Sequence, residues 1–424
     1  MHTRLGWQAG ALSAHEGMIE RIIVENFKSF RRVDLKLGRL NLFVGTNASG
    51  KSNFFDALRI LQGIGNGFTL LEILDGKPRS ATTEVWEAIR GGSAKAPLAS
   101  GPGEDRLVFD VAGRFDDDPG KKWQYRIEFL AREGRLCQEK LLLGDKFVFD
   151  SSPVWSDPHG PVLKVCYYRG KPGQPPALPF EMSRPVLTQM ARGGNGKWSK
   201  AHAEAAERLA RLLANMQRID PSPAVLRSYS QAHEIRRMGE RGENFAALIR
   251  TLCADPKTKE AYLSWLRELR PREVDDLGTL SGAVGEPLFM LKEGGREFPA
   301  PVLSDGTLRF AAITAALFQP DMPGVMTIEE IENGVHASRL RLLVELLRSR
   351  AAQGATQIMA TTHSPIVLAW LKPEEYAHTF FCKRDEESGE SRICPLTEIP
   401  HFTETIRKQP ISDLFAEGWL EAAL

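Results

Sequence analysis

Hydrophobic positions near both ends of the chain recur with the spacing of buried strands and amphipathic helices. Two short apolar runs, 19–24 and 40–44, are typical of buried strands, and we expect a turn between them at 30–34. From Lys51 to about Gln62, apolar residues recur every three or four positions, which predicts a helix with one apolar face. The same alternation of helix and strand returns near the carboxyl end, with helices at 305–318 and 338–353 and strands at 325–328 and 356–360.

The middle of the chain follows a different pattern. Between 107 and 149, short alternating runs separated by charged turns predict a series of antiparallel hairpins, and the proline-rich residues 151–180 look irregular. Helices are expected at about 201–216, 244–253 and 257–269, and strands near 276–280 and 287–292. We therefore expect a disordered extension at 1–17, two parts of one α/β core at 18–104 and 296–424, an antiparallel β subdomain at 105–180 and a mostly helical insertion at 181–295.

A phosphate-binding loop follows the second predicted strand. The segment GTNASGKS has the pattern G-x-x-x-x-G-K-[ST] between a strand and a helix. Its glycines let backbone N–H groups point inward, and the helix start adds partial positive charge, so the loop can cradle phosphates. Lys51 should reach the β- and γ-phosphates, and the hydroxyl of Ser52 should bind Mg²⁺. The predicted cofactors are ATP and Mg²⁺, contacted by Gly45, Thr46, Asn47, Ala48, Ser49, Gly50, Lys51, Ser52 and Asn53.

Two carboxylates and a histidine end the later strands. The run VMTI leads into Glu329 and Glu330, and successive strand-end residues point in different directions. We assign Glu329 to the metal and Glu330 to polarising the attacking water, against the alternative of a surface acidic turn. His363 ends the next strand, where it can hydrogen-bond the γ-phosphate or the water.

A serine and a glycine open the helix predicted at 305–318. The simplest interpretation is that Ser304 caps this helix. The alternative is functional, with the Ser304 hydroxyl and the Gly306 N–H forming a second anion site.

In order, these motifs resemble the head of an ABC ATPase. The segments IVENFKSF at 23–30 and IEEIENGVH at 328–336 are similar to those of the SMC, RecF and OLD group. The resemblance implies an α/β head with a mixed β-sheet P-loop core, and ATP hydrolysis. It further implies a homodimer that closes on ATP, with Ser304 and Gly306 acting in trans and with Lys28 and Ser29 near the nucleotide.

The sequence departs from the family pattern at a few positions. Asp305 replaces a signature glycine, Glu329 replaces a common aspartate, and Ile331 and Ala337 replace prolines, so slow turnover is expected. The family's Q-loop glutamine has no clear counterpart, and 86–92 is the nearest candidate.

Charge and composition narrow the partners only slightly. The 55 Lys+Arg and 54 Asp+Glu give a net charge of +1, so any DNA contact has to come from a local patch. Five scattered cysteines, no apolar run of about 18 residues and no signal peptide indicate a cytoplasmic protein with no membrane partner. A local basic region, interleaved with glutamates, is either a DNA contact or a solvated helix face: Arg192, Lys197, Lys200, Arg218, Arg227, Arg236, Arg237 and Arg241.

Three roles for the ATPase remain open from the sequence. The first is a nucleic-acid-linked switch in DNA repair or anti-phage defence, suggested by the resemblance. The second is a regulatory scaffold that holds or releases a separate nuclease or toxin effector, since no nuclease constellation is visible. The third, a transporter subunit, fits poorly because 278 residues (329 − 51) separate Lys51 from Glu329.

Overall fold

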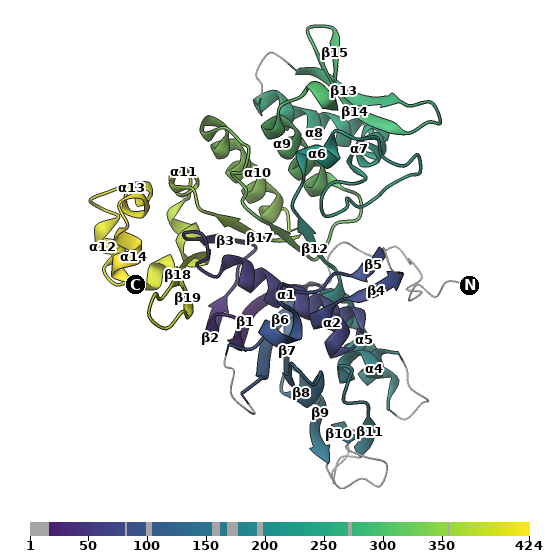
Figure 1. The fold of residues 1–424 in the computed structure, drawn as a ribbon, viewed down its shortest axis with the longest axis vertical. Helices are drawn as coiled ribbons and strands as arrows, with labels where there is room; N and C mark the ends of the chain where they lie inside the picture. The colour runs from purple at the N-terminus through teal and green to yellow at the C-terminus, as the bar shows by residue number, and fades with distance from the viewer. Residues whose placement is uncertain are drawn as a thin grey trace.

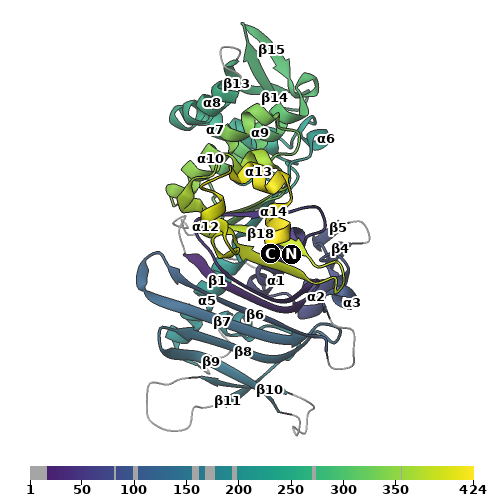
Figure 2. The ribbon, with the colours of Figure 1, turned by 90° about the vertical axis from the view of Figure 1, so that its left-hand side faces the viewer.

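Two stacked β-sheets and a helical lobe make up the chain in a computed structural model (Figures 1 and 2). The structure describes residues 17–80, 83–98, 104–154, 162–167, 177–192, 198–269, 274–354 and 356–424. The extension expected at 1–17 lies outside the described residues apart from Gly17. Among the described residues, no helix is long and apolar enough to cross a membrane.

The larger sheet is antiparallel and has the strand order β11-β10-β9-β8-β7-β6-β1-β2. Its strands are β1 (Met18–Phe27), β2 (Phe30–Lys36), β6 (Arg106–Phe115), β7 (Asp118–Leu130), β8 (Arg135–Leu143), β9 (Lys146–Val154), β10 (Val162–Tyr167) and β11 (Ala177–Phe180). The turn expected at 30–34 is wrong, because these residues form β2, in which Phe30, Val33 and Leu35 are buried. The irregular segment expected at 151–180 likewise contains strands.

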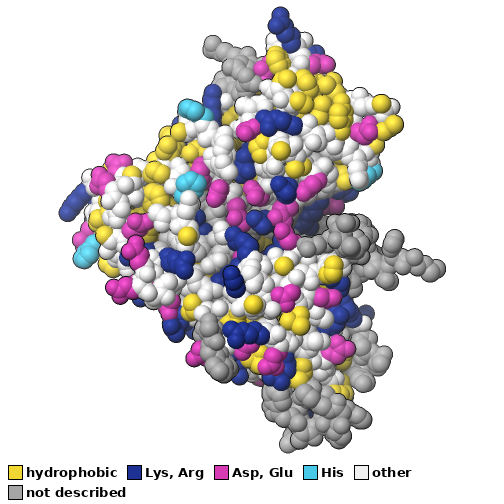
Figure 3. All heavy atoms as spheres, in the orientation of Figure 1, with side chains coloured by type: hydrophobic (Ala, Val, Ile, Leu, Met, Phe, Trp, Pro, Cys, Tyr) yellow, Lys and Arg dark blue, Asp and Glu magenta, His cyan; other side chains and the backbone are white. Residues whose placement is uncertain are grey.

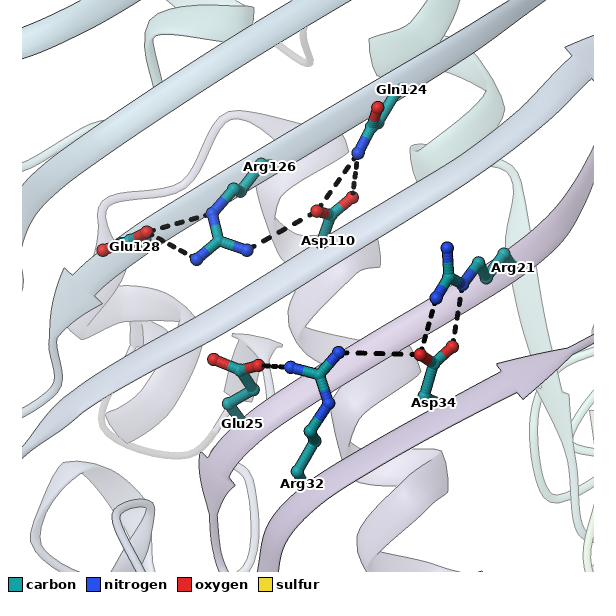
Figure 4. A network of polar contacts seen from close by, with 8 residues as sticks. All are labelled: Arg21, Glu25, Arg32, Asp34, Asp110, Gln124, Arg126 and Glu128. Carbon is teal, nitrogen blue, oxygen red and sulfur yellow. Dashed lines mark hydrogen bonds and ion pairs between the residues drawn. The ribbon is translucent and has the colours of Figure 1, made fainter. Parts of the chain in front are cut away.

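The outer face of this sheet carries alternating acids and bases. Figure 4 shows them side by side on β1, β2, β6 and β7 as Arg21, Glu25, Arg32, Asp34, Asp110, Gln124, Arg126 and Glu128. Arg21 donates to both oxygens of Asp34 at 2.8 and 2.6 Å, and Arg126 lies 2.7 Å from Glu128. The partly exposed Arg21–Asp34 pair contributes at most about 1 kcal/mol, whereas Asp110 and Glu128 are buried and are neutralised by Arg126.

The second sheet is mostly parallel and carries the phosphate loop. Its order is β12-β16-β17-β3-β18-β19, with only β19 antiparallel to its neighbour. The strands are β3 (Leu40–Val44), β12 (Met216–Ile219), β16 (Val325–Ile328), β17 (Gln357–Thr362), β18 (Thr379–Arg384) and β19 (Ser391–Pro395). The helix expected to reach Met216 ends at Ala214, and Met216 opens β12.

Alternate residues of the parallel strands fill two separate cores. Phe43 and Phe380 point into the core shared with the antiparallel sheet, where Phe43 lies 4.6 Å from the ring centroid of Phe54. Leu42 and Phe381 point into the opposite core, which is shared with the lobe. A buried sheet with helices or a second sheet on each face is the arrangement expected for parallel strands.

The remaining elements divide between the two cores. Several helices pack against the first core: α1 (Lys51–Asn66), α2 (Leu70–Asp75), α4 (Val186–Ala191) and α5 (Lys200–Ala214). Next to them lie β4 (Lys77–Ser80), β5 (Thr83–Trp86) and α3 (Gly92–Lys95). The upper lobe, residues 223–318, holds α6 (Pro223–Leu226), α7 (Phe245–Ala254), α8 (Pro256–Leu269), β13 (Val274–Ser281), β14 (Pro287–Glu293), β15 (Arg296–Pro299) and α9 (Asp305–Phe318). Beyond it come α10 (Leu340–Ala352), α11 (Pro365–Leu368), α12 (Phe402–Thr405), α13 (Ile411–Ala416) and α14 (Trp419–Ala423).

The expected helical insertion at 181–295 is therefore not one body. Its first helices, α4 and α5, pack against α1, whereas α7 and α8 pack in the upper lobe with α9. Between them β12 crosses into the parallel sheet, and β13 and β14 form a hairpin in the lobe.

A fully buried carboxylate, Glu139 on β8, joins the antiparallel sheet to α4. It accepts hydrogen bonds from the N–H groups of Val186 (2.6 Å) and Leu187 (2.8 Å) and from the hydroxyl of Tyr125 (2.9 Å). Burial raises the pKa of Glu139 to about 7, although these three donors oppose the shift. The folded chain therefore binds a proton more tightly than the unfolded chain between about pH 4.5 and 7.

Replacing Glu139 with alanine should destabilise the fold by about 3 kcal/mol, because three buried donors lose their acceptor. A raised pKa of Glu139 stabilises the folded chain most at low pH, where the carboxyl group is protonated. The difference in unfolding free energy between wild type and Glu139→Ala should therefore shrink as the pH rises from 5 to 7. Urea unfolding at pH 5, 6 and 7 measures both effects. An advantage that stays constant across these pH values would show that Glu139 titrates normally.

Candidate ATP-binding site

Four parallel strands bring the candidate residues to one edge of the sheet. The carboxyl ends of parallel strands lie at the same edge, where ligands of open α/β sheets bind. The phosphate loop follows β3, Glu329 and Glu330 follow β16, and His363 follows β17. Asp220, which the sequence analysis did not single out, follows β12 at the same edge.

The phosphate loop requires glycine at both of its ends. Gly45 has φ 156° and Gly50 has φ 108°, a region that side chains rarely adopt. A Cβ on Gly45 would lie 2.2 Å from the carbonyl oxygen of Cys382, and one on Gly50 would lie 2.7 Å from Oγ of Ser391. The Oγ of Ser49 is buried with no hydrogen-bond partner among the described residues. The loop fits a phosphate chain, since its backbone is tightly wound and it holds a spare buried donor.

Lys51 lies inside this loop. Its Nζ donates to the carbonyl oxygens of Gly45 at 2.6 Å and Thr46 at 2.7 Å, and the residue is 8% exposed. Burial lowers the pKa of Lys51, and the acids nearby oppose that shift. The ammonium group is thus directed into the hollow of the loop by the loop's own carbonyls.

The two residues assigned to the metal lie together. The hydroxyl of Ser52 donates to Oε2 of Glu329 across 3.4 Å. Hydroxyl and carboxylate oxygens are ligands that Mg²⁺ prefers, and Mg²⁺ usually takes few protein ligands beside phosphate and water. Among the described residues, no group of three or more His, Cys, Asp or Glu could hold a metal ion without such help. This pair therefore fits Mg²⁺ brought with a nucleotide.

An arginine that the sequence analysis treated as surface charge orients Glu329. Arg218 on β12 lies 3.1 Å from Oε1 of Glu329 and 3.1 Å from Glu240. Burial raises the pKa of Glu329, and the charge of Arg218 opposes that shift. This arginine was missed because the apolar spacing before it continues a helical pattern and hides β12.

Lys28 and Ser29 lie against the first turns of α1. The side chain of Lys28 is buried and forms an ion pair with Asp56, and Nδ2 of Asn53 donates to Oγ of Ser29 at 2.8 Å. The segment 86–92, the Q-loop candidate, also reaches this helix, because Arg90 donates to the carbonyl oxygen of Ser52 at 2.7 Å. These contacts hold the start of α1, and none of them involves Lys51.

Glu330 and His363 lie on adjacent strand ends, and a third acid lies with them. Glu330 is exposed, has φ 47° and donates its N–H to Oγ1 of Thr361 at 2.9 Å. Nδ1 of His363 lies 3.0 Å from Oε1 of Glu332. No sequence motif distinguishes Glu332 from the nearby Glu329 and Glu330. All three side chains belong to the edge that also holds the phosphate loop.

The signature segment lies elsewhere. Ser304 caps α9 by accepting from the N–H of Thr307 at 3.2 Å, and Arg227 donates to Oδ1 of Asp305 at 2.5 Å. The helices that mainly contact α9 are α6, α7, α8 and α10, whereas α1 contacts α2, α4 and α5. Both ribbon views show α9 in the upper lobe, apart from α1 (Figures 1 and 2).

The basic region proposed as a DNA contact is dispersed and largely paired. Arg236 bonds Asp321 at 3.0 Å, Lys200 lies 3.5 Å from Glu204, and burial lowers the pKa of Arg237 to about 10. Arg218 and Arg227 are engaged as described above, and Lys197 lies outside the described residues. In Figure 3 basic and acidic side chains are interspersed over the visible face. Of the basic residues in this region, Lys200, Arg218, Arg227 and Arg236 each lie against a carboxylate.

Two family models match separate segments of the chain, one before and one after strands β6 to β11. The model described as "AAA domain, putative AbiEii toxin, Type IV TA system" matches residues 196–369, and the model described as "AAA ATPase domain" matches residues 18–75. A Helicobacter pylori protein described as an ATP/GTP phosphatase is 23% identical over 401 residues, which cover 87% of this chain and 93% of that protein.

Solved structures with a similar chain path include SMC heads. The SMC head domain of Thermotoga maritima has a TM-score of 0.42 at 14% identity and covers 89% of this chain and 98% of that one. A Pyrococcus furiosus SMC head bound to the C-terminal domain of ScpA has a TM-score of 0.48 at 13% identity and covers 92% of this chain and 100% of that one.

The chain is a P-loop ATPase. Its fold is mixed α/β, with a parallel P-loop sheet beside an antiparallel one.

Proposed function

We propose that this ATPase is a homodimeric switch that closes on ATP and opens after hydrolysis. Each ATP, with Mg²⁺ held by Ser52 and Glu329, would lie between the phosphate loop of one subunit and Ser304 and Gly306 of the other. In that arrangement Lys51 binds the phosphates and Glu330 accepts a proton from the attacking water. The bound Mg²⁺ supplies charge neutralisation at the phosphates.

The position of the signature segment carries this proposal. Ser304 is exposed at the start of a 14-residue helix, α9, which contacts α6, α7, α8 and α10 and lies apart from α1, the helix that follows the phosphate loop (Figures 1 and 2). A helix start with an exposed serine and glycine favours an anion. Because the subunit's own phosphate loop lies apart from α9, we expect Ser304 and Gly306 to contact ATP that is held by the phosphate loop of a second copy.

The signature segment is also connected to the catalytic edge of its own subunit. A Cβ on Gly306 would lie 2.2 Å from the carbonyl oxygen of Gly334, four residues after Glu330. ATP held by the phosphate loop of one subunit would contact the signature segment of the other. The close backbone packing of Gly306 against Gly334 would then connect this ATP to the acids of that second subunit.

Mixing two inactive variants tests the shared site. Lys51→Ala and Ser304→Arg should each lose ATP turnover. In a 1:1 mixture, half of the dimers combine both variants and hold one intact site each, so about a quarter of wild-type turnover should return. Phosphate release measures the turnover, and sizing in ATP monitors the dimer. If mixed dimers form and no turnover returns, Lys51 and Ser304 do not share a site in trans.

Nucleic acid, in DNA repair or anti-phage defence, is the target that the group's resemblance suggests first. ATP turnover with and without double-stranded DNA tests it, and stimulation by DNA supports it. The alternative role, a scaffold for a separate nuclease or toxin, is favoured by the pairing of the arginines and by the toxin-system description of the matched model. Turnover that ignores DNA and responds to a co-purified effector would select the scaffold.

A further inference from the structure

We propose that Glu332 is a positioning residue that sets the orientation of the His363 ring toward the attacking water. This inference rests on the proposed function, because it assumes that His363 faces the γ-phosphate side of the site. It assigns a role to an acid of the segment 328–336 that differs from the roles of Glu329 and Glu330.

Two polar groups of His363 lie near the same oxygen of Glu332. The backbone N–H of His363 donates to Oε1 of Glu332 at 2.7 Å, and Nδ1 lies 3.0 Å from that oxygen. An ionised carboxylate can only accept hydrogen bonds, so this close approach favours the ring form that carries its hydrogen on Nδ1. In that neutral form, Nε2 has a lone pair and accepts a hydrogen bond.

This assignment separates the two roles left open for His363. A lone pair on Nε2 accepts from the attacking water, whereas binding a γ-phosphate oxygen would need a hydrogen on Nε2. The ring is partly exposed, with 44% of its side chain accessible, while the side chain of Glu332 is only 9% exposed. The ring is thus accessible to a ligand, while the side chain of Glu332 beside it is largely buried.

A rigid support fixes Glu332. The residue before it, Ile331, is fully buried, and its N–H donates to the carbonyl oxygen of Thr361 at 3.1 Å. This bond links the end of β16 to β17, the strand that leads to His363. The other carboxylate oxygen of Glu332, Oε2, is buried with no hydrogen-bond partner among the described residues. A buried acid with this much spare acceptor capacity is more typical of a functional site than of packing.

Glutamine and alanine at position 332 distinguish positioning from base catalysis. In Glu332→Gln, an amide oxygen can replace Oε1 and keep the backbone hydrogen bond and the contact with Nδ1, so kcat should stay within about tenfold of wild type. In Glu332→Ala both contacts are lost, so kcat should fall about 10- to 100-fold while KM for ATP changes little. If glutamine and alanine lose activity equally and as severely as Glu330→Gln, Glu332 is itself the base and the proposal is wrong.

A double-mutant cycle with His363→Ala tests whether Glu332 acts through the histidine. If it does, adding Glu332→Ala to His363→Ala should reduce kcat less than about twofold further. A full additional loss, or an unchanged kcat in Glu332→Ala alone, overturns the proposal. Binding of a fluorescent ATP analogue and thermal unfolding show that each variant is folded, and Glu345→Ala at a partly exposed position of α10 is a matched control.

These outcomes are distinct from a failure of the dimeric switch. If mixing Lys51→Ala with Ser304→Arg restores no turnover, the proposal of a shared site is wrong. The double-mutant cycle between Glu332 and His363 can still be measured, because it needs only the kcat of each variant relative to wild type.

Discussion

Lys51→Ala is expected to lower ATP turnover at least about 100-fold and to weaken ATP binding, because it removes the ammonium group directed into the phosphate loop. In the structure this group donates to the carbonyls of Gly45 and Thr46. Among the described residues, no other lysine lies within that loop. Phosphate release and titration with a fluorescent ATP analogue measure the two effects.

Lys36→Ala provides the matched control for Lys51→Ala. Lys36 is exposed on β2, so its loss removes the same charge away from the site. Its turnover should remain at the wild-type level. Turnover of Lys51→Ala within threefold of wild type would contradict the assignment of the loop.

Glu330→Gln is expected to keep ATP affinity and to lose at least about 100-fold in kcat, because a neutral amide cannot accept the proton of the attacking water. The left-handed backbone at Glu330 costs about 1 kcal/mol or more and is held by the bond from its N–H to Thr361. Glutamine preserves this bond, so geometry and charge are separated. Sizing in ATP and Mg²⁺ should show an accumulated dimer.

Glu345→Gln removes an equivalent charge from a partly exposed position of α10 and should behave as wild type. Loss of ATP affinity in Glu330→Gln, or turnover equal to wild type, would move the role of base to another acid. Glu332 would be the first candidate, since it lies on the same strand end.

Much of the P-loop sheet and its helices could be predicted because their patterns are local. The helix at 305–318 and the strand at 325–328 have the predicted bounds, since each is a short, strongly apolar segment between polar ends. β2 was missed because Arg31, Arg32 and Asp34 look like a turn when their exposed face is unknown. β12 was missed because four residues after a long amphipathic helix continue its spacing, and only the sheet shows that they form a strand.

The site residues that lie within a sequence motif could be predicted. Those that only the folded chain brings together could not. The pairing of Ser52 with Glu329 joins residues far apart in the chain that two motifs already marked. The roles of Arg218 and Glu332 depend on tertiary contacts, and their residue types are common on protein surfaces. Conversely, the sequence cannot show the carboxylates that lie against Arg218, Arg227 and Arg236.

The strand order of the P-loop sheet has a consequence for synthesis of the protein. β3 ends at residue 44, whereas its two neighbours, β17 and β18, are made much later, at 357–362 and 379–384. A strand with unpaired edges exposes hydrogen-bonding groups and apolar side chains to other chains. The sheet around the phosphate loop therefore cannot be completed on a ribosome-bound chain until both of these strands have emerged, and β3 is exposed to aggregation until then.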